Sequence, residues 1–309
     1  MLNLNNFAYE KTELDQNLAR KLLTLHTGDK LPSTREFAES MDASLGSISS
    51  SLNYLEQVGA VTIKRRGRLG SFLDGKSLGR LWSIIENNPL VIAQTLPSFK
   101  KCEGLATAIN SMLNNAGVET YMIFIRGSIN RLNALRHGQC HAAIMSELAA
   151  DELIGENEEI ILRLPAQTFV TGHNVFYRGK QSSSKEPLRV GIDSASYDVK
   201  YLTELEFAGK NVEYHQMSFV QIDSHLEEST VDAAISDLDH KEMLTSGEIY
   251  SRPLSPRVER SLGGRNTSAA IVIRSESHTT RTVLTETLNC DEVVRIQQQV
   301  VDGKMVPRY

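Results

Sequence analysis

The chain has 309 residues, of which 40% are hydrophobic and 23% charged, and its net charge is −5. These values are ordinary for soluble globular proteins, and at about 150 residues per domain the length suggests two domains. The apolar stretches are far shorter than the roughly 20 residues of a membrane-spanning helix, and we expect no secretory signal. Three widely spaced cysteines exclude a disulfide framework. We therefore expect a cytoplasmic protein with reduced thiols and no membrane partner.

The first 75 residues contain the signals of three helices followed by two short β-like runs. Ser33, with Glu36 three residues later, forms a capping box at the start of the second helix. Ser44 caps the third helix, and Gly59 ends it. The two β-like runs, at 61–63 and 71–73, form a hairpin that we call the wing. Two helices across a short turn followed by a basic hairpin predict a winged helix-turn-helix domain, mainly α, over residues 1–75.

This stretch also resembles the DNA-binding domain of GntR-type transcription regulators. The shared residues are a Leu-Pro-Ser-x-Arg-x-x-Ala opening from Leu31, a leucine at Leu52 and a Gly-x-x-Gly-Ser-Phe wing from Gly67. The resemblance implies double-stranded DNA as a partner. One departure concerns the recognition helix, where Leu45 and Ser49 replace the arginines that such helices usually carry near their start.

The predicted DNA contacts lie at the two helix starts and in the wing. Neutral hydroxyls near the start of the recognition helix, Ser51 included, can contact phosphates or bases, and the arginine of the opening motif suits a phosphate or a guanine. Up to residue 75 the chain has nine basic and nine acidic residues, so the acidic excess belongs to the rest, while the wing concentrates basic charge that favours phosphate binding. The predicted residues are Ser33, Arg35, Ser44, Ser47, Ser49, Ser50, Lys64, Arg65, Arg66 and Arg68.

The segment at 76–88 is amphipathic and ends at Pro89. Leu78, Leu81, Trp82 and Ile85 share one helical face. We interpret the segment as a linker helix that packs on a neighbour, with the first helix of the second domain as the alternative.

Strand and helix signals alternate after Pro89 and predict an α/β domain over 89–309. A strand–helix–strand–helix–strand order spans 90–146 and recurs over 188–236. The extended runs 167–178 and 268–276 are placed as crossover strands, and 290–303 is a closing helix. We expect two lobes, lobe one at about 89–166 with a returning C-terminal segment and lobe two at about 187–250. This order resembles type 2 periplasmic binding proteins, and the whole chain resembles YhfZ-type regulators.

A ligand of such a domain would lie between the lobes, at the carboxyl ends of strands. Hydroxyl residues at helix N-termini suit a carboxylate or phosphate, and Arg126 suits a bidentate grip on an anion. The alternatives are plain capping for the serines and an ion pair for Arg126. The predicted ligand-binding residues are Ser98, Phe99, Arg126, Gly127, Ser128, Ser146, Asp193, Ser194, Ser196 and Asp237.

The sequence contains no catalytic or cofactor motif that we could identify, so we expect no catalytic residue, cofactor or metal. His137 and His141 have a metal-compatible spacing, but Gly138 interrupts the helix between them. Cys102, near a helix start, is the one candidate nucleophile if the two-lobed domain is an enzyme.

These features predict a DNA-binding transcription regulator that works as a homodimer. The two-lobed domain would sense a small, anionic metabolite, and lobe closure would move the heads through the linker helix. The alternatives are an enzyme or a ligand-binding module whose DNA-binding head is vestigial, the latter favoured by Leu45 and Ser49.

Overall fold

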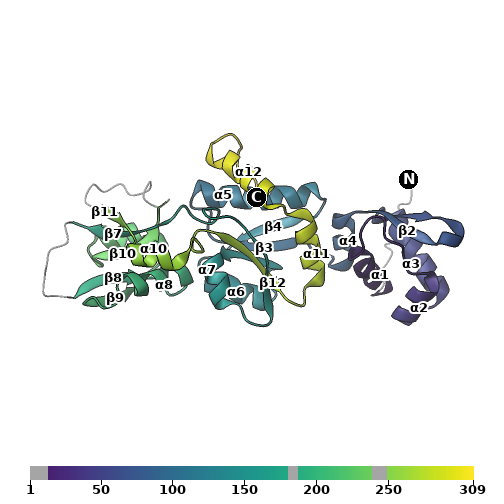
Figure 1. Ribbon diagram of the computed structural model, residues 1–309, viewed down its shortest axis with the longest axis horizontal. Helices are drawn as coiled ribbons and strands as arrows, with labels where there is room; N and C mark the ends of the chain where they lie inside the picture. The colour runs from purple at the N-terminus through teal and green to yellow at the C-terminus, as the bar shows by residue number, and fades with distance from the viewer. Residues whose placement is uncertain (1–12, 180–186, 239–248) are drawn as a thin grey trace, which may run out of the picture. The chain divides into compact units, whose positions relative to one another are not determined.

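The computed structural model describes residues 13–179, 187–238 and 249–309. Residues 1–12 of the predicted first domain and 239–248 of the predicted second lobe lie outside the described residues. The chain divides into two compact units (Figure 1). The first comprises Met1–Leu90, Met112–Thr120 and His278–Thr287, and the second comprises Val91–Ser111, Tyr121–Ser277 and Leu288–Tyr309.

The first unit begins with a helical bundle and a two-stranded antiparallel sheet. Its elements are α1 (Glu13–Leu23), α2 (Thr34–Met41), α3 (Leu45–Gln57), β1 (Val61–Arg65), a 3₁₀ turn at Gly67–Leu69, β2 (Ser71–Lys76) and α4 (Leu78–Ile85). Ser33 and Ser44 cap α2 and α3, and Asp42 ends α2 in the left-handed conformation. Local caps therefore define the helix–turn–helix, while Phe37 and Ile48, both buried, anchor its core.

Helix α4 packs on α1, and α11 (His278–Thr287) packs on both. Gly79 of α4 lies against Gly117, which follows α5 (Lys100–Asn115) and has the left-handed conformation. A Cβ built on Gly79 would lie 1.8 Å from the Gly117 carbonyl oxygen. Only glycine fits this position, because any side chain would overlap the backbone of the neighbouring segment.

Two five-stranded sheets form the second unit, and each lies at the centre of one lobe. The first has the order β4-β3-β5-β12-β6, with β3 parallel to β5 and β12 antiparallel to both of its neighbours. Helices α5 and α12 cover one face and α6 and α7 the other (Figure 1). The bounds are β3 (Leu90–Gln94), α5 (Lys100–Asn115), β4 (Thr120–Phe124), α6 (Ser128–Arg136), β5 (Ala142–Ser146), α7 (Glu147–Leu153), β6 (Glu158–Arg163), β12 (Ala269–Arg274) and α12 (Cys290–Val301).

The second sheet repeats this arrangement, with the order β9-β8-β10-β7-β11 when read in the same direction. Strand β10 is parallel to β8 and antiparallel to β7, and β11 is antiparallel to β7. The bounds are β7 (His173–Arg178), β8 (Leu188–Ile192), α8 (Tyr197–Glu206), β9 (Val212–Gln216), a 3₁₀ turn at Phe219–Gln221, α9 (Ile222–Glu227), β10 (Ala233–Asp237), β11 (Ile249–Pro253) and α10 (Pro256–Leu262).

The two crossover strands occupy equivalent places in the two sheets. Strand β7 leaves lobe one and pairs between β10 and β11, while β12 returns and pairs between β5 and β6. Both runs were expected as crossovers. The Ala-Ala-Ile phrases of β5 and β10 also hold matching central positions, each beside a parallel strand. The internal repeat seen in the sequence is therefore a repeat of sheet topology.

Candidate functional site

Hydroxyl groups fix the starts of both helices of the helix–turn–helix. The Ser33 Oγ accepts from the Glu36 N–H at 3.2 Å, and the Glu36 carboxylate accepts from the Ser33 N–H at 2.6 Å. The Ser44 Oγ accepts from the Ser47 N–H at 3.0 Å. These bonds satisfy donors that a helix start leaves free, so Ser33 and Ser44 have a structural role whatever else they contact.

The solvent-facing side of α3 is uncharged. Leu45, Ser47, Ser49 and Ser50 are exposed, and the Ser49 hydroxyl donates to the Leu45 carbonyl oxygen at 2.9 Å. Ser51 does not share this side, contrary to the prediction. It is 2% exposed and donates to the carboxylate of Asp15 on α1, because its position in the helix turns it toward the core with Ile48 and Leu55.

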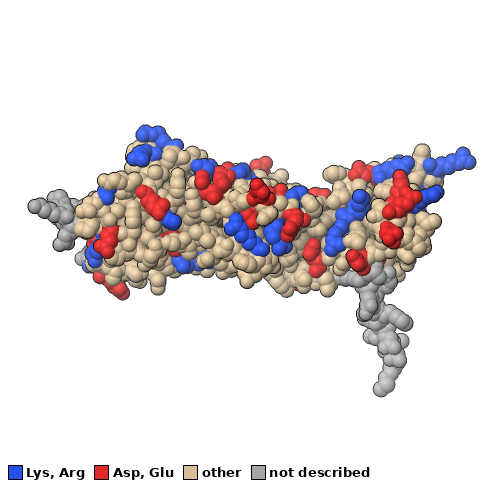
Figure 2. Space-filling view, turned by 90° about the horizontal axis from the view of Figure 1, so that it is seen from below, with Lys and Arg blue, Asp and Glu red and all other residues tan. Residues whose placement is uncertain are grey.

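Basic side chains of the wing and of α2 border α3. Arg65 is bound to Glu56 on α3, and the Arg66 guanidinium lies 4.8 Å from the centre of the Phe72 ring. Arg35 pairs with Glu39 at 3.1 Å on the exposed side of α2. Lys64 and Arg68 are exposed at the hairpin, and Figure 2 shows Lys and Arg side chains projecting at the wing end of the first unit.

A groove of about 490 Å³ lies between α3 and the wing. Hydroxyl, amide and cationic groups dominate its polar lining, and Leu52 contributes an apolar patch. Its lining residues are Lys30, Leu31, Pro32, Ser33, Thr34, Glu36, Ser49, Leu52, Asn53, Ile63, Arg65, Gly67, Arg68, Gly70 and Ser71. The predicted residues Ser33, Ser49, Arg65 and Arg68 therefore share one concave surface.

A second cavity, of about 50 Å³, lies between the lobes of the second unit. It has room for a few water molecules, well below the 300–1,000 Å³ of a typical ligand site, so the lobes are closed on it. Its lining residues are Thr95, Leu96, Ser98, Phe99, Cys102, Gly127, Arg131, Phe169, Val170, His173, Ser196, Asp198, Val199, Phe219, Ser236 and Asp237.

Half of the predicted ligand residues line this cavity: Ser98, Phe99, Gly127, Ser196 and Asp237. Arg126 lies outside the lining and pairs with Asp193 at 2.6 Å, while also donating to Ser218 at 3.1 Å. Asp193 accepts from the N–H groups of Ala195 and Phe219 as well. The Asp193 carboxylate thus holds the position at Arg126 that was expected for an anionic ligand. Ser194 is exposed and donates to Gln216.

Two further predicted serines join the lobes to each other. Ser128, on α6, accepts from the Tyr197 N–H at 3.0 Å, and Ser146, at the end of β5, donates to Asp198 at 2.7 Å. Ser146 also caps α7. Both serines are buried, so they hold the start of α8 against lobe one in the closed arrangement.

Arg131 and Asp198 form the charged centre of the cavity. The sequence indicated Asp198, with Asp193 and Asp237, as a partner for a ligand amine or for the other lobe, whereas Arg131 was missed. The Arg131 guanidinium, 3% exposed, donates to the carbonyl oxygens of Ile144 and Ile125. Burial lowers the pKa of Arg131 to about 10 and raises the pKa of Asp198 to about 6. A charged residue on the buried stripe of α6, between Ser128 and Leu135, was the signal available in the sequence.

Ser236 and Cys102 complete the polar lining. The Ser236 hydroxyl is 1% exposed and lacks a hydrogen-bond partner within the described residues, which leaves an unsatisfied group at the cavity wall. Cys102, the candidate nucleophile, is 2% exposed in the first turn of α5. His173 contacts Asn266 at 3.0 Å.

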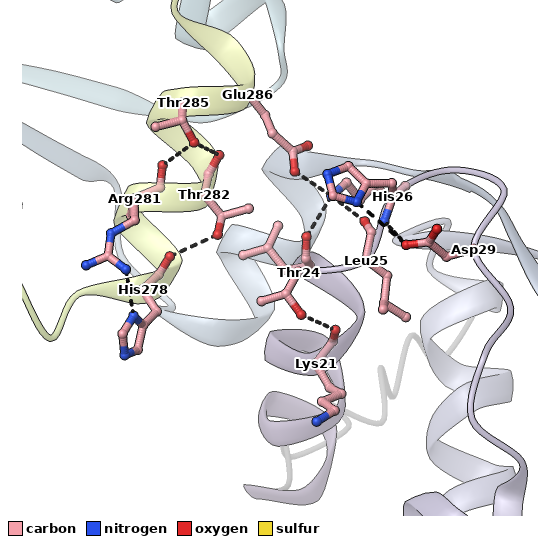
Figure 3. A network of polar contacts seen from close by, with 12 residues as sticks. Lys21, Thr24, Leu25, His26, Asp29, His278, Arg281, Thr282, Thr285 and Glu286 are labelled. Carbon is pink, nitrogen blue, oxygen red and sulfur yellow. Dashed lines mark hydrogen bonds and ion pairs between the residues drawn. The ribbon is translucent and has the colours of Figure 1, made fainter. Parts of the chain in front are cut away.

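A polar cluster joins α11 to the rest of the first unit (Figure 3). The Lys76 ammonium donates to the carbonyl oxygens of Leu23 and Leu25, at the end of α1, and to Glu286 of α11 at 2.7 Å. The Lys76 side chain is only 8% exposed. A cation at the carboxyl end of a helix is favourably placed, and Glu286 fixes it from the opposite side.

The described ranges 13–179, 187–238 and 249–309 contain no helix that is long and apolar enough to cross a bilayer. They also contain no cluster of three or more histidine, cysteine or carboxylate side chains placed to hold a metal ion.

The fold defines a protein with a helix-turn-helix head and a two-lobed α/β domain, in which each lobe is built on one five-stranded sheet, as predicted. A helix-turn-helix family matches residues 26–73, and the YhfZ C-terminal domain family matches residues 78–309. The chain belongs to the YhfZ family. It is 30% identical to the uncharacterized protein YhfZ of Escherichia coli K12 over 94% of this chain and 95% of that protein. The crystal structure of YhfZ from Shigella flexneri matches with a TM-score of 0.61 at 29% identity, covering 75% of this chain and 98% of that one.

The expected family is confirmed, whereas the GntR likeness, the dimer and the domain boundaries at residues 75 and 88 stay predictions.

Proposed function

We propose that this protein is a transcription regulator that binds double-stranded DNA through its head and responds to a small molecule held between its lobes. The observation that supports it best is the combination, in one chain, of a solvent-facing helix α3 beside a basic wing and a two-lobed domain closed on a polar cavity. A regulator that binds the chromosome acts in the cytoplasm of a bacterial cell, which is the location expected from the cysteines of this chain. The residues predicted to contact DNA remain our proposed interface.

The DNA-binding part is tested by the salt dependence of binding to the duplex upstream of the protein's own gene. Replacing Lys64, Arg66 and Arg68 with glutamine is expected to reduce the slope of log K against log salt by up to about 2.7, at about 0.9 for each lost phosphate contact. Fluorescence anisotropy of a labelled duplex gives this slope.

The matched control replaces three exposed cations of the second unit, Arg295, Lys304 and Arg308, with glutamine and should leave the slope unchanged. Absence of binding by the wild type at low salt would exclude the DNA-binding proposal.

The effector is proposed to be a small anion that replaces Asp193 at Arg126. Asp193 already accepts from a guanidinium and two backbone N–H groups, which is how a protein holds a ligand carboxylate. Opening of the lobes separates Arg126 from Asp193 and leaves a vacant cation. The Ser236 hydroxyl, which has no hydrogen-bond partner in the part of the chain that the structure describes, offers a further polar contact within the same domain.

A thermal-shift panel of phosphate, sulfate and small mono- and dicarboxylates tests this class of effector. We expect at least one anion to raise the melting temperature of the wild type, the Arg126→Ala variant to lose that shift, and Asp193→Asn to strengthen it by removing the competing charge. Arg163→Ala, a change at an exposed arginine paired with Glu147 and Asp151, is the control. A shift caused by small amines while all anions are silent would contradict the proposal.

The cluster around Lys76 is proposed to couple the ligand-binding domain to the head. Helix α11 directly follows the crossover strand β12, and Glu286 on α11 binds the lysine that caps α1. Movement of β12 during lobe opening would therefore be transmitted through α11 and Lys76 to α1, the helix that packs on α3. In a homodimer this would change the separation of the two heads, and half-sites about 34 Å apart tolerate few separations.

A further inference from the structure

The start of helix α3 presents an apolar side chain to solvent. Leu45 is the first residue of α3 and is 55% exposed. It lies one turn before Ser49 and about two turns before Leu52, and residues at these spacings share a helix face. Ser49 and Leu52 line the groove beside the wing. Leu45 thus continues the groove surface toward the end of the helix where recognition helices contact base edges.

This face of α3 has no cation for the bidentate recognition of guanine. The helix contains no lysine or arginine, and its one charged residue is Glu56, which is bound to Arg65. The exposed hydroxyls near Leu45 include those of Ser47 and Ser49, of which the latter already donates to a backbone carbonyl. Bidentate recognition of guanine in the major groove requires arginine or lysine, so this helix start must read something else.

A leucine methyl group has a direct counterpart in the major groove. Thymine is the base that carries a methyl group there, and apolar side chains contact it. Positive charge lies beside α3 rather than on it, with Lys30 and Arg68 in the groove wall and Lys64 and Arg66 on the wing. This arrangement fits a duplex whose phosphates meet the flanking cations while its base edges meet an uncharged helix start.

We propose that Leu45 determines the specificity of the head by contacting a thymine methyl group in each half-site of the operator. The proposal rests on the proposed DNA-binding function. It assigns sequence recognition at the start of α3 to apolar contact, with the hydroxyls of Ser47 and Ser49 as neutral neighbours. The operator is accordingly expected to carry an A·T pair at the position that GntR-type helices read with arginine.

Substitution of uracil for thymine isolates the methyl group, because the two bases differ in nothing else. Duplexes are first selected by the full-length wild type from a randomised pool, and each thymine of the selected site is then replaced in turn. We expect one position per half-site to weaken wild-type binding about fourfold, the factor that corresponds to about 0.8 kcal/mol for one buried CH₂ group. The Leu45→Ala variant should bind the thymine duplex several-fold more weakly and show no further loss with uracil.

Two variants control for indirect effects. Leu45→Met keeps an apolar contact and should retain the uracil penalty. Leu69→Ala removes another exposed leucine, 65% exposed in the wing, and should also retain it. Wild-type protein that selects a specific duplex but tolerates uracil at every position, or a penalty that persists in Leu45→Ala, overturns this inference while the DNA-binding function stands. Failure to select any duplex overturns both. A change from dimer to monomer in Leu45→Ala, measured by light scattering, would assign Leu45 to a contact between copies instead.

Discussion

Replacement of Gly79 by alanine is expected to lower the free energy of unfolding of the first unit by at least about 3 kcal/mol, the upper part of the range for overpacking. The reason is geometric, because the added Cβ would lie 1.8 Å from the carbonyl oxygen and 2.2 Å from the carbonyl carbon of Gly117. Both are backbone atoms, so no side chain can rotate away. Helix α4 would have to move off its contact, and with it the packing of Trp82 and Ile85.

Urea unfolding followed by circular dichroism and by the fluorescence of Trp82 on α4 measures this effect, since the chain has a single tryptophan. Gly46→Ala is the control. A Cβ there lies 3.7 Å from its nearest neighbour, and alanine in a helix is more favourable than glycine by up to about 1 kcal/mol. A Gly79→Ala protein as stable as the wild type would show that α4 and the turn at Gly117 are not in contact in solution.

Replacement of Arg131 by methionine is expected to lower the free energy of unfolding of the second unit by about 3–5 kcal/mol at neutral pH. The change leaves the carbonyl oxygens of Ile125 and Ile144 without their donor and the buried Asp198 without its nearby cation. Arg295→Met is the control, because Arg295 forms an exposed pair with Glu292 and such pairs contribute about 0–1 kcal/mol.

The deficit of the Arg131→Met variant should depend on pH. Burial raises the pKa of Asp198 to about 6 from 3.8, so the folded protein holds this proton more tightly than the unfolded chain. Stability contributed by the neutral carboxyl is fully present below about pH 4 and is lost as the pH rises toward 6. In the Arg131→Met variant, the charge of Arg131 no longer lowers the pKa of Asp198. The loss of stability that accompanies ionisation of this carboxyl therefore extends to pH values above 6.

Urea unfolding at about pH 5 and about pH 7.5 therefore gives a smaller deficit at the lower pH. Measured against the single variant Asp198→Asn, the double variant Arg131→Met/Asp198→Asn should show a deficit that does not depend on pH, since asparagine does not titrate and neither protein carries the carboxyl. An equal deficit of the single variant at both pH values would contradict a buried interaction between Arg131 and Asp198.

Local signals in the sequence predict most of the elements. Strands β3, β5, β8 and β10 are apolar runs whose short length and flanking turn residues identify them as strands. Helices α5 and α12 carry apolar stripes, so periodicity identifies them. The capping box at Ser33, the N-cap at Ser44 and the glycine at position 59 define the head in the same way. The missed elements lack such signals. Helix α7 has only seven residues and no clear apolar stripe. Strand β6 lies at the edge of its sheet and begins with two glutamates, so its sequence lacks the apolar run of a buried strand.

The candidate ligand site was harder to predict because its contacts are long-range. Arg126 and Asp193 are both recognisable as polar residues at strand ends, yet their pairing across 67 positions is decided by how the lobes meet. Arg131 lies on a helical stripe of otherwise apolar residues, a pattern that predicts a core position. Its role depends on donation to carbonyl oxygens of β5 and of the residue after β4, which only the folded structure brings close to it. The wing, by contrast, could be recognised from sequence because its residues are adjacent in the chain.

Because a strand from late in the chain, β12, completes the sheet of lobe one, the two lobes acquire their last strands in the reverse of their order in the sequence. The second lobe has all its strands, β7 to β11, once residue 253 has left the ribosome. The first lobe, although it starts earlier, lacks the strand between β5 and β6 until β12 ends at Arg274. Until then β5 presents an unpaired edge, which invites wrong pairing, and the closing contacts span more than 100 residues, which slows folding. The lobe that is translated first is therefore completed last, and a nascent chain stalled before β12 would display the aggregation-prone edge of β5.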